Sequence, residues 1–174
     1  MDITKISCGK RFPECINVVI EIPQNSVGIK YEIDKDSGAV FVDRFLATPM
    51  HYPANYGFVP NTLSGDGDPA DVLVISPYTV HPGCVIEARP IGVLITQDEK
   101  GYDEKIIAVP SSSVTKECED VVDIEDLHHS ILDKIKHFFE HYKDLEKGKF
   151  VKVEGFGDAK KAIEILLVAQ KNFK

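Results

Sequence analysis

Two strand-like segments enclose a polar turn in the stretch Ile29-Lys-Tyr-Glu-Ile33-Asp-Lys-Asp-Ser-Gly38-Ala-Val40-Phe-Val-Asp-Arg-Phe45. In the first segment apolar residues alternate with Lys30 and Glu32, so these two charged side chains lie on one face of the strand. The turn ends in Gly38, which can adopt the positive φ that tight hairpins require. The stretch therefore predicts a β-hairpin in which Arg44, on the second strand, lies near Lys30 and Glu32. An ordinary half-exposed hairpin has the same alternation, so this pattern alone assigns no function.

Apolar or alternating runs of the same kind occur on both sides of this hairpin, separated by Gly, Pro and Asp. They cover residues 18–22, 72–75, 85–95 and 105–109. A second tight turn is predicted at Asp98-Glu-Lys-Gly101, between the last two runs. The first two thirds of the chain are therefore expected to be rich in β-strands.

Two helices are predicted in the last third of the chain. Apolar residues recur at steps of three and four from Leu127 to Leu145, which places them on one helical face. Asp126 is a candidate N-cap of this helix, and Gly148 follows its end. A second helix is predicted from about Asp158 to Gln170. Many short strands followed by helices favour an α+β, mainly β protein, with a closed or nearly closed barrel and two flanking helices.

The composition is that of a globular protein. The chain has 174 residues, of which 43% are hydrophobic and 28% charged, and no repeat or linker divides it, so we expect a single domain over residues 1–174. The longest apolar run, Ile165 to Ala169, is too short to span a bilayer, and no secretory signal follows Met1. Four cysteines without a C-x-x-C pair indicate reduced thiols. A net charge of −8 disfavours nucleic acid and anionic membranes as partners. Because neither a membrane span nor a secretory signal is predicted, we expect a cytoplasmic protein.

Three carboxylates occur within the six-residue segment Asp66-Gly-Asp68-Pro-Ala-Asp71. They repel one another unless cations neutralise them, and oxygen ligands suit hard ions such as Mg²⁺, Mn²⁺ or Ca²⁺. An EF-hand calcium loop fits badly, because Ala70 and Pro77 fall at ligand positions five and twelve. The alternative is a solvated acidic turn. The segment is therefore a candidate metal-binding loop.

Further charged and phenolic groups can complete such a site. Asp98 and Asp103 flank the second predicted turn, and Lys105 lies on the same strand face as Asp103. A surface hairpin would carry similar charges. In the segment from His51 to Pro60, Tyr52 and Tyr56 can donate hydrogen bonds to phosphate oxygens, or the segment can serve as an aromatic plug of a barrel end. Carboxylates for a metal beside cations for oxygens are what a metal–phosphate complex requires.

The sequence His137-Phe-Phe-Glu-His141 matches the H-x-x-E-H pattern of inverted zinc peptidases. Such a site needs a third protein ligand, and the only glutamates that follow are Glu146, Glu154 and Glu164. A five-residue pattern also arises easily in an amphipathic helix. We expect the two histidines to lie on the polar flank of the helix or at a subunit contact.

These residues resemble the soluble, metal-dependent inorganic pyrophosphatases of the bacterial type, known as family I. The resemblance extends from Val18-Val-Ile-Glu-Ile-Pro23 to Phe150-Val-Lys-Val-Glu-Gly155, and its most specific part is the loop Asp66-Gly-Asp-Pro-Ala-Asp-Val72. The other matching segments are Lys30-Tyr-Glu32, Val42-Asp-Arg-Phe45, His51 to Asn61, Asp98, Asp103-Glu-Lys105 and Phe138-Phe-Glu-His-Tyr-Lys143.

The resemblance implies a five-stranded closed barrel of the oligonucleotide-binding type with flanking helices, assembled as a homohexamer. It implies an inorganic diphosphatase that hydrolyses pyrophosphate to two orthophosphates by in-line attack of a metal-activated water. Several Mg²⁺ ions per active site are expected, with Mn²⁺ or other divalent ions as substitutes.

The resemblance also implies a role for each site residue. Asp68 is expected to be the general base on the attacking water, and Glu21 and Tyr52 are expected to support the site. The expected metal ligands are Asp66, Asp71, Asp98, Asp103 and Glu32. The expected phosphate-binding residues are Lys30, Arg44, Tyr56, Lys105, Tyr142 and Lys143.

Two functions of other classes compete with hydrolysis of pyrophosphate. A barrel that sequesters a divalent ion or a phosphorylated ligand would bind metal and release no phosphate. A single-stranded nucleic-acid-binding barrel would need a basic groove, which the acidic balance of the chain disfavours.

Overall fold

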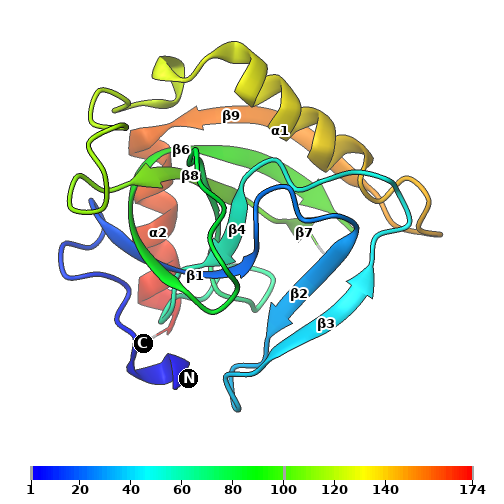
Figure 1. The fold of residues 1–174 in the computed structure, drawn as a ribbon, viewed down its shortest axis with the longest axis horizontal. Helices are drawn as coiled ribbons and strands as arrows, with labels where there is room; N and C mark the ends of the chain where they lie inside the picture. Colours follow the sequence, from blue (N-terminus) through cyan, green and yellow to red (C-terminus); the bar gives the residue numbers. More distant parts are fainter. Residues whose placement is uncertain (1, 100, 174) are drawn as a thin grey trace.

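A computed structural model describes residues 2–99 and 101–173 (Figure 1). A short 3-10 helix, Ile3–Lys5, precedes the first strand, and a second one, Ile124–Asp126, precedes the first α-helix. The strands are β1 (Ile16–Ile22), β2 (Ile29–Ile33), β3 (Val40–Phe45), β4 (Asn55–Phe58), β5 (Asp71–Val74), β6 (Val85–Asp98), β7 (Gly101–Tyr102), β8 (Lys105–Pro110) and β9 (Val151–Asp158). The helices are α1 (His129–His141) and α2 (Ala159–Phe173).

Hydrogen bonding closes a ring of five strands within the described part of the chain, in the order β1, β4, β5, β8 and β6, with β6 pairing back to β1. All neighbours are antiparallel except β5 and β8, which are parallel. Strand β6 is long enough to pair also with β7 and β9 outside the ring. The predicted five-stranded barrel in a mainly β protein with two flanking helices is confirmed.

The hairpin predicted from the opening stretch is confirmed. Strands β2 and β3 pair with each other as a separate two-stranded sheet, which projects from the ring in Figure 1. Lys30 is the register partner of Arg44, and Gly38 has the positive φ of 68° that the turn predicts. The second predicted turn lies between paired Asp98 and Gly101, although its Lys100 is outside the described residues.

Three strands were not predicted from the sequence: the two-residue β7, which follows the second predicted turn, and the longer β4 and β9. Strand β4 lies inside the His51–Pro60 segment, where Gly57 breaks the apolar pattern. A Cβ atom at Gly57 would lie 2.0 Å from the carbonyl oxygen of Val19, so the close approach of β1 requires glycine here. Strand β9 pairs with β6 from the outside of the ring and alternates apolar with charged residues.

The predicted limits of the first helix are wrong at both ends. Helix α1 begins after His128, whose side chain accepts a hydrogen bond from the backbone N–H of Ser130. Asp126 instead belongs to the preceding 3-10 turn, where it accepts from the N–H groups of Val122 and Asp123. At the other end the chain tightens into i→i+3 turns after His141, because the following residues turn toward a cavity.

The second helix starts as predicted and ends later. The Asp158 side chain caps it by accepting from the N–H of Lys161 at 2.8 Å, and α2 continues to Phe173. Figure 1 shows α2 packed against the ring and α1 along β9. No helix among residues 2–99 and 101–173 is long and apolar enough to cross a membrane.

Alternate residues of the ring strands feed two apolar clusters. Along β5, Val72 and Val74 belong to the same cluster as Leu166 of α2, whereas Leu73 belongs to the cluster that contains Phe138 of α1. The four aliphatic side chains are fully buried, and Phe138 is almost fully buried. Each helix therefore shares an apolar core with the ring. This packing holds the ends of the strands in place.

Candidate active site

A cavity of about 200 Å³ lies at one end of the ring. The parallel strands β5 and β8 both begin there, and the antiparallel strand β6 ends there. The cavity brings together all of the predicted site residues except Tyr52. Those that line it are Glu21, Lys30, Glu32, Arg44, Tyr56, Asp66, Asp68, Asp71, Asp98, Asp103, Lys105, Tyr142 and Lys143.

Lys105 is buried in the acidic wall of the cavity, with 4% of its surface exposed. Its Nζ makes ion pairs with the carboxylates of both Asp71 and Asp103. The pairing of β5 with β8 places Asp71 directly opposite Lys105, and Asp103 lies two residues earlier on the same face. Burial lowers the pKa of Lys105, but the two carboxylates outweigh burial and hold this pKa above its ordinary value.

A second ion pair closes the adjacent part of the wall. Lys143, just beyond α1, has its Nζ 3.1 Å from Asp98 Oδ2 and 3.8 Å from Glu99 Oε2. Lys143 is buried, so this pair is largely removed from solvent. The tightened turn after α1 thus places the ammonium group of Lys143 beside Asp98, at the end of β6.

The β2–β3 hairpin supplies the opposite, cationic side. Asp43 Oδ2 lies 3.0 Å from Lys30 Nζ and 2.9 Å from an Arg44 guanidinium nitrogen, so one carboxylate aligns both cations. Glu146, beyond α1, lies 3.4 Å from Arg44 Nε. At the hairpin turn, Lys35 Nζ lies 3.2 Å from Asp68 Oδ1.

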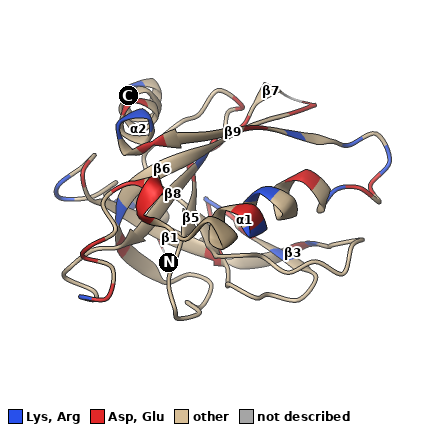
Figure 2. Cartoon of the chain, turned by 90° about the horizontal axis from the view of Figure 1, so that it is seen from above, with Lys and Arg blue, Asp and Glu red and all other residues tan. Residues whose placement is uncertain are grey.

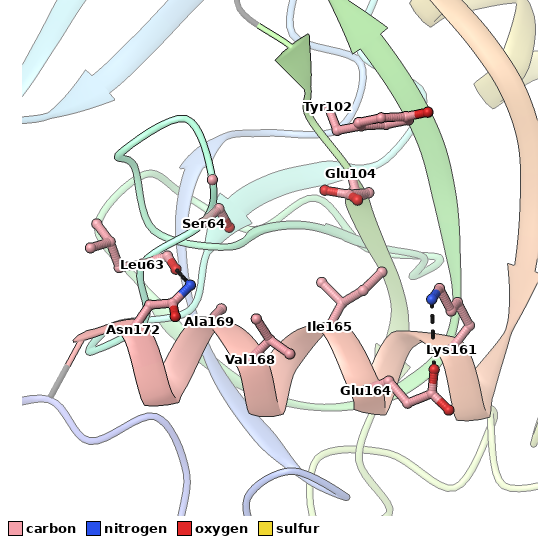
Figure 3. Close-up of a pocket in the computed structure, with 11 residues that line it drawn as sticks. Leu63, Ser64, Tyr102, Glu104, Lys161, Glu164, Ile165, Val168, Ala169 and Asn172 are labelled. Atoms are coloured by element: carbon pink, nitrogen blue, oxygen red, sulfur yellow. Dashed lines mark hydrogen bonds and ion pairs between the residues drawn. The ribbon is translucent and has the colours of Figure 1, made fainter.

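The acidic loop is held by its own backbone and by α2. Within the loop, the Ser64 N–H donates to the Asp68 carbonyl at 2.7 Å, and the Asp68 N–H donates to Asp66 Oδ1 at 3.1 Å. At its base the Leu63 N–H donates to the carbonyl of Ala169, and Asn172 Nδ2 donates to the carbonyl of Leu63. Figure 3 shows the hydrogen bond between Asn172 and Leu63.

The same figure shows a second cavity, of about 370 Å³, on the far side of the acidic loop. It lies between α2 and the segments that carry Ser64, Tyr102 and Glu104, and it contains none of the predicted site residues. Lys161 and Glu164 of α2 form an ion pair of 3.6 Å at one end of it. This cavity is therefore separate from the carboxylate-lined one.

Glu21 forms part of the cavity's inner end and is 9% exposed. One of its carboxylate oxygens accepts a hydrogen bond of 2.9 Å from the N–H of Ile33, which ties β2 to β1. Burial, aided by Asp71 and Glu32 and opposed by the Ile33 hydrogen bond, raises the pKa of Glu21 to about 7. Burial also raises the pKa of Asp103, against the opposing effect of Lys105. Burial therefore disfavours the ionised form of both carboxyl groups.

The tyrosines keep their protons in this environment. Burial raises the pKa of Tyr56 and of Tyr142 well above the ordinary value, so both phenols remain hydrogen-bond donors at neutral pH. The Tyr56 ring centroid lies 5.9 Å from Lys105 Nζ. Tyr52 lies behind the cavity wall, with its ring 5.7 Å from that of Tyr56 and 4.7 Å from that of Phe138. Tyr52 therefore packs against Tyr56 and Phe138 and does not line the cavity.

Several residues at the cavity are not predicted from the sequence. Lys35 belongs to the hairpin turn, and Glu99 belongs to the second turn, so both were assigned to turns alone. Asp43 stands beside Arg44 in the sequence, but the register of β2 with β3 shifts at this position, so simple alternation does not predict its ion pair with Lys30. Phe58, Pro69 and Lys149 complete the lining.

The residues fit a hard divalent cation by type. All the anionic donors are carboxylate oxygens, as Mg²⁺ prefers. Among residues 2–99 and 101–173, however, no group of three or more His, Cys, Asp or Glu side chains is arranged to hold a metal ion. Lys105 lies between two of the carboxylates instead.

The two histidines of the H-x-x-E-H sequence are exposed on α1, on the polar flank predicted for them. Their ring centroids are 4.7 Å apart, and His141 Nδ1 lies 2.8 Å from Asp144 Oδ2. Neither lines the carboxylate-rich cavity.

The chain matches known proteins along almost its whole length. The model of the inorganic pyrophosphatase family matches residues 18–174. The chain is 61% identical over 159 residues to the inorganic pyrophosphatase of Pseudomonas aeruginosa, covering 91% of each chain, and 56% identical over 174 residues to inorganic pyrophosphatase 1 of Pseudomonas syringae pv. tomato, covering 100% of this chain and 99% of the relative. The structure of the Thermus thermophilus inorganic pyrophosphatase has a TM-score of 0.94 at 42% identity, covering 99% of both chains. From sequence and fold together, this chain belongs to the inorganic pyrophosphatase family.

Proposed function

We propose that this protein is an inorganic diphosphatase, which hydrolyses inorganic pyrophosphate to two orthophosphates by in-line attack of a metal-activated water. The observation that carries this proposal is a single cavity lined by both carboxylates and basic groups. The carboxylates come from β2, β5, β6, the acidic loop and Asp103, and the basic groups include Lys30 and Arg44 of the hairpin. A metal-bound diphosphate needs both kinds of group, because the carboxylates hold the cations and the basic groups hold the phosphate oxygens.

Several magnesium ions are proposed as the cofactors, with Mn²⁺ or other divalent ions as substitutes. The proposed ligands are Asp66, Asp71, Asp98, Asp103 and Glu32. When bound, the ions supply Lewis-acid polarisation of the substrate and a water of lowered pKa. The ring supports this assignment because it presents Asp71, Asp98 and Asp103 from three adjoining strand ends.

Asp68 is the proposed general base. The Asp68 side chain is 57% exposed, so water reaches its carboxylate. A carboxylate can accept a proton from an acidified water. Lys35, 3.2 Å away, holds its orientation. The restraint of the loop by α2 keeps this base at a fixed place relative to β5.

The cations and phenols are proposed to bind the phosphates. Lys30, Arg44, Lys105 and Lys143 stabilise the charge that develops on the leaving phosphate, and Tyr56 and Tyr142 donate hydrogen bonds. Glu21 supports this side, because its hydrogen bond to Ile33 fixes the strand that carries Lys30.

Hydrolysis in ¹⁸O-labelled water tests this proposal. Attack of water on phosphorus predicts that the first turnover of each pyrophosphate places a solvent oxygen in one of the two phosphates. Metal binding with no phosphate released would instead identify a protein that only sequesters the ion or its ligand. An oligonucleotide mobility shift that weakens with salt would support the nucleic-acid alternative. Figure 2 shows acidic and basic residues interspersed over the helices and loops, which does not favour that outcome.

A homohexamer in the cytoplasm is also proposed. Large apolar side chains are exposed on the hairpin and on α2, as expected of surfaces that other copies cover: Phe41, Phe45, Val168 and Phe173 are each more than half exposed. Sedimentation equilibrium should give about six times the chain mass of 19.4 kDa; a monomer would contradict the proposal. The cysteines Cys8, Cys15, Cys84 and Cys118 are free, as expected in a reducing compartment.

A further inference from the structure

The ammonium group of Lys105 lies between two carboxylates. Its ammonium is paired with two carboxylates at once, those of Asp71 and Asp103, and it is almost completely buried. Each of these carboxylates is itself only 23% exposed, so water screens the attraction weakly. The three groups therefore form a strong internal ion-pair cluster.

The cluster is fixed by the ring. Asp71 and Lys105 are register partners at the first positions of β5 and β8. The residues that follow them, Val72 and Ile106, are buried in the core, so neither strand end can move away from the other without disturbing the ring. The backbone at Asp103 is held as well, because its N–H donates to the carbonyl of Thr96 at 2.9 Å.

The same two carboxylates belong to the proposed metal ligands, and the inference therefore rests on the proposed function. A divalent cation that binds both must take them from the ammonium of Lys105, and the two cations repel each other at this distance. We propose that Lys105 is an internal counter-ion of the metal-free protein, which competes with the divalent ion for Asp71 and Asp103 and so weakens metal affinity.

The proposal gives Lys105 two partners in succession. Without a metal ion its ammonium neutralises the carboxylates and stabilises the fold around them. With the ion bound, Lys105 loses those partners and is available to a phosphate oxygen of the substrate. Lys105 thereby links metal binding to substrate binding, in addition to its proposed contact with phosphate.

Replacement of Lys105 by Met tests the competition. Titration calorimetry with Mg²⁺ alone, without substrate, should show binding to Lys105→Met that is about tenfold tighter or more than to the wild type, which corresponds to about 1.4 kcal/mol. Removal of any positive charge from the cavity will tighten metal binding somewhat, so a matched control is needed.

Lys30→Met is that control. It removes one positive charge from the same cavity with the same substitution, but Lys30 pairs with Asp43, which is not among the proposed metal ligands. We expect its Mg²⁺ affinity to change much less than that of Lys105→Met. Equal tightening in both variants would reduce the effect to general electrostatics and overturn the proposal.

Thermal unfolding gives a readout that is independent of activity. Without divalent ions, Lys105→Met should unfold at a lower temperature than the wild type, because two partly buried carboxylates lose their counter-ion. Saturating Mg²⁺ should raise the unfolding temperature of the variant more than that of the wild type, because the ion binds the folded state alone. A variant that folds only with Mg²⁺ supports the proposal, whereas one that stays unfolded in saturating Mg²⁺ contradicts it.

Failure of the competition and failure of the proposed function give different results. If the wild type binds Mg²⁺ and Lys105→Met binds it no more tightly, the competition is wrong and the proposed function stands. If neither protein binds any divalent ion, the proposed metal-dependent function fails, and the inference fails with it.

Discussion

Asp68 and Asp71 stand three residues apart in the acidic loop, in different surroundings. The Asp68 side chain is 57% exposed and paired with Lys35 of the hairpin turn, whereas that of Asp71 is 23% exposed and paired with the buried Lys105. An exposed carboxylate is suited to receive a proton from water, and a half-enclosed one beside other carboxylates is suited to hold a cation. The two residues should therefore fail in different ways when they are replaced.

Asp68→Asn is expected to lower kcat by about 10²–10⁴-fold, the usual contribution of a general base, with little change in Mg²⁺ affinity. Asp71→Asn is expected to lower both kcat and Mg²⁺ affinity, because it removes a proposed ligand. Steady-state kinetics across a range of Mg²⁺ concentrations, with calorimetric metal titrations, separate the two effects. Equal losses of metal affinity in both variants would contradict the roles given to these residues.

Glu21 predicts a pH dependence of stability in the metal-free protein. Its pKa is raised from 4.5 to about 7, so between these pH values the folded protein retains a proton that the unfolded chain releases. A raised carboxyl pKa means that stability is full below about pH 4.5 and is lost as the pH rises toward 7. This loss is at most about 3 kcal/mol.

Glu21→Gln removes the titrating group and keeps an oxygen that can accept the Ile33 hydrogen bond. Urea unfolding in EDTA should therefore show the variant gaining stability relative to the wild type as the pH rises from 4.5 to 7. Parallel profiles for the two proteins over this range would show that Glu21 titrates at its ordinary pKa when the protein is folded.

At the scale of elements, α2 supports the ring and the acidic loop together. Leu166 is fully buried in the apolar cluster that also contains residues of β1 and β5, and the neighbouring Leu167 is 47% exposed. Leu166→Ala should lower the free energy of unfolding by about 2–5 kcal/mol, because it leaves a cavity in the core. Leu167→Ala is the matched control and should change it by about 0.5 kcal/mol or less. Chemical denaturation measures both, and similar losses would show that α2 does not pack as described.

The elements that could be predicted from sequence were those with an unbroken period. The β2–β3 hairpin has clear alternation and a glycine at its turn, and its bounds were predicted correctly. Strand β4 was missed because Gly57 is required for contact with β1, which no local pattern reveals. Helix α1 is shorter than its apolar period because the chain turns after His141 to bring Lys143 to Asp98. Tertiary contacts override local preference at both places.

At the scale of the whole molecule, ring closure explains what single segments cannot. The residue types of the site could be identified from sequence, because acidic and basic groups stand at recognisable positions in the loops and strands. Their pairing could not be predicted. Asp71 meets Lys105 only because β5 and β8 are parallel neighbours, and Glu146 reaches Arg44 from a distant part of the chain. The acidic loop is likewise held by the C-terminal helix, more than one hundred residues later in sequence.

The most direct test of the account is phosphate release from pure protein and pyrophosphate, measured with Mg²⁺ and again with excess chelator. The account predicts rapid release of two phosphates per pyrophosphate with Mg²⁺ and almost none with the chelator, with activity restored when Mg²⁺ is returned. No release by folded, metal-loaded protein would contradict it, and so would equal release with and without the metal ion.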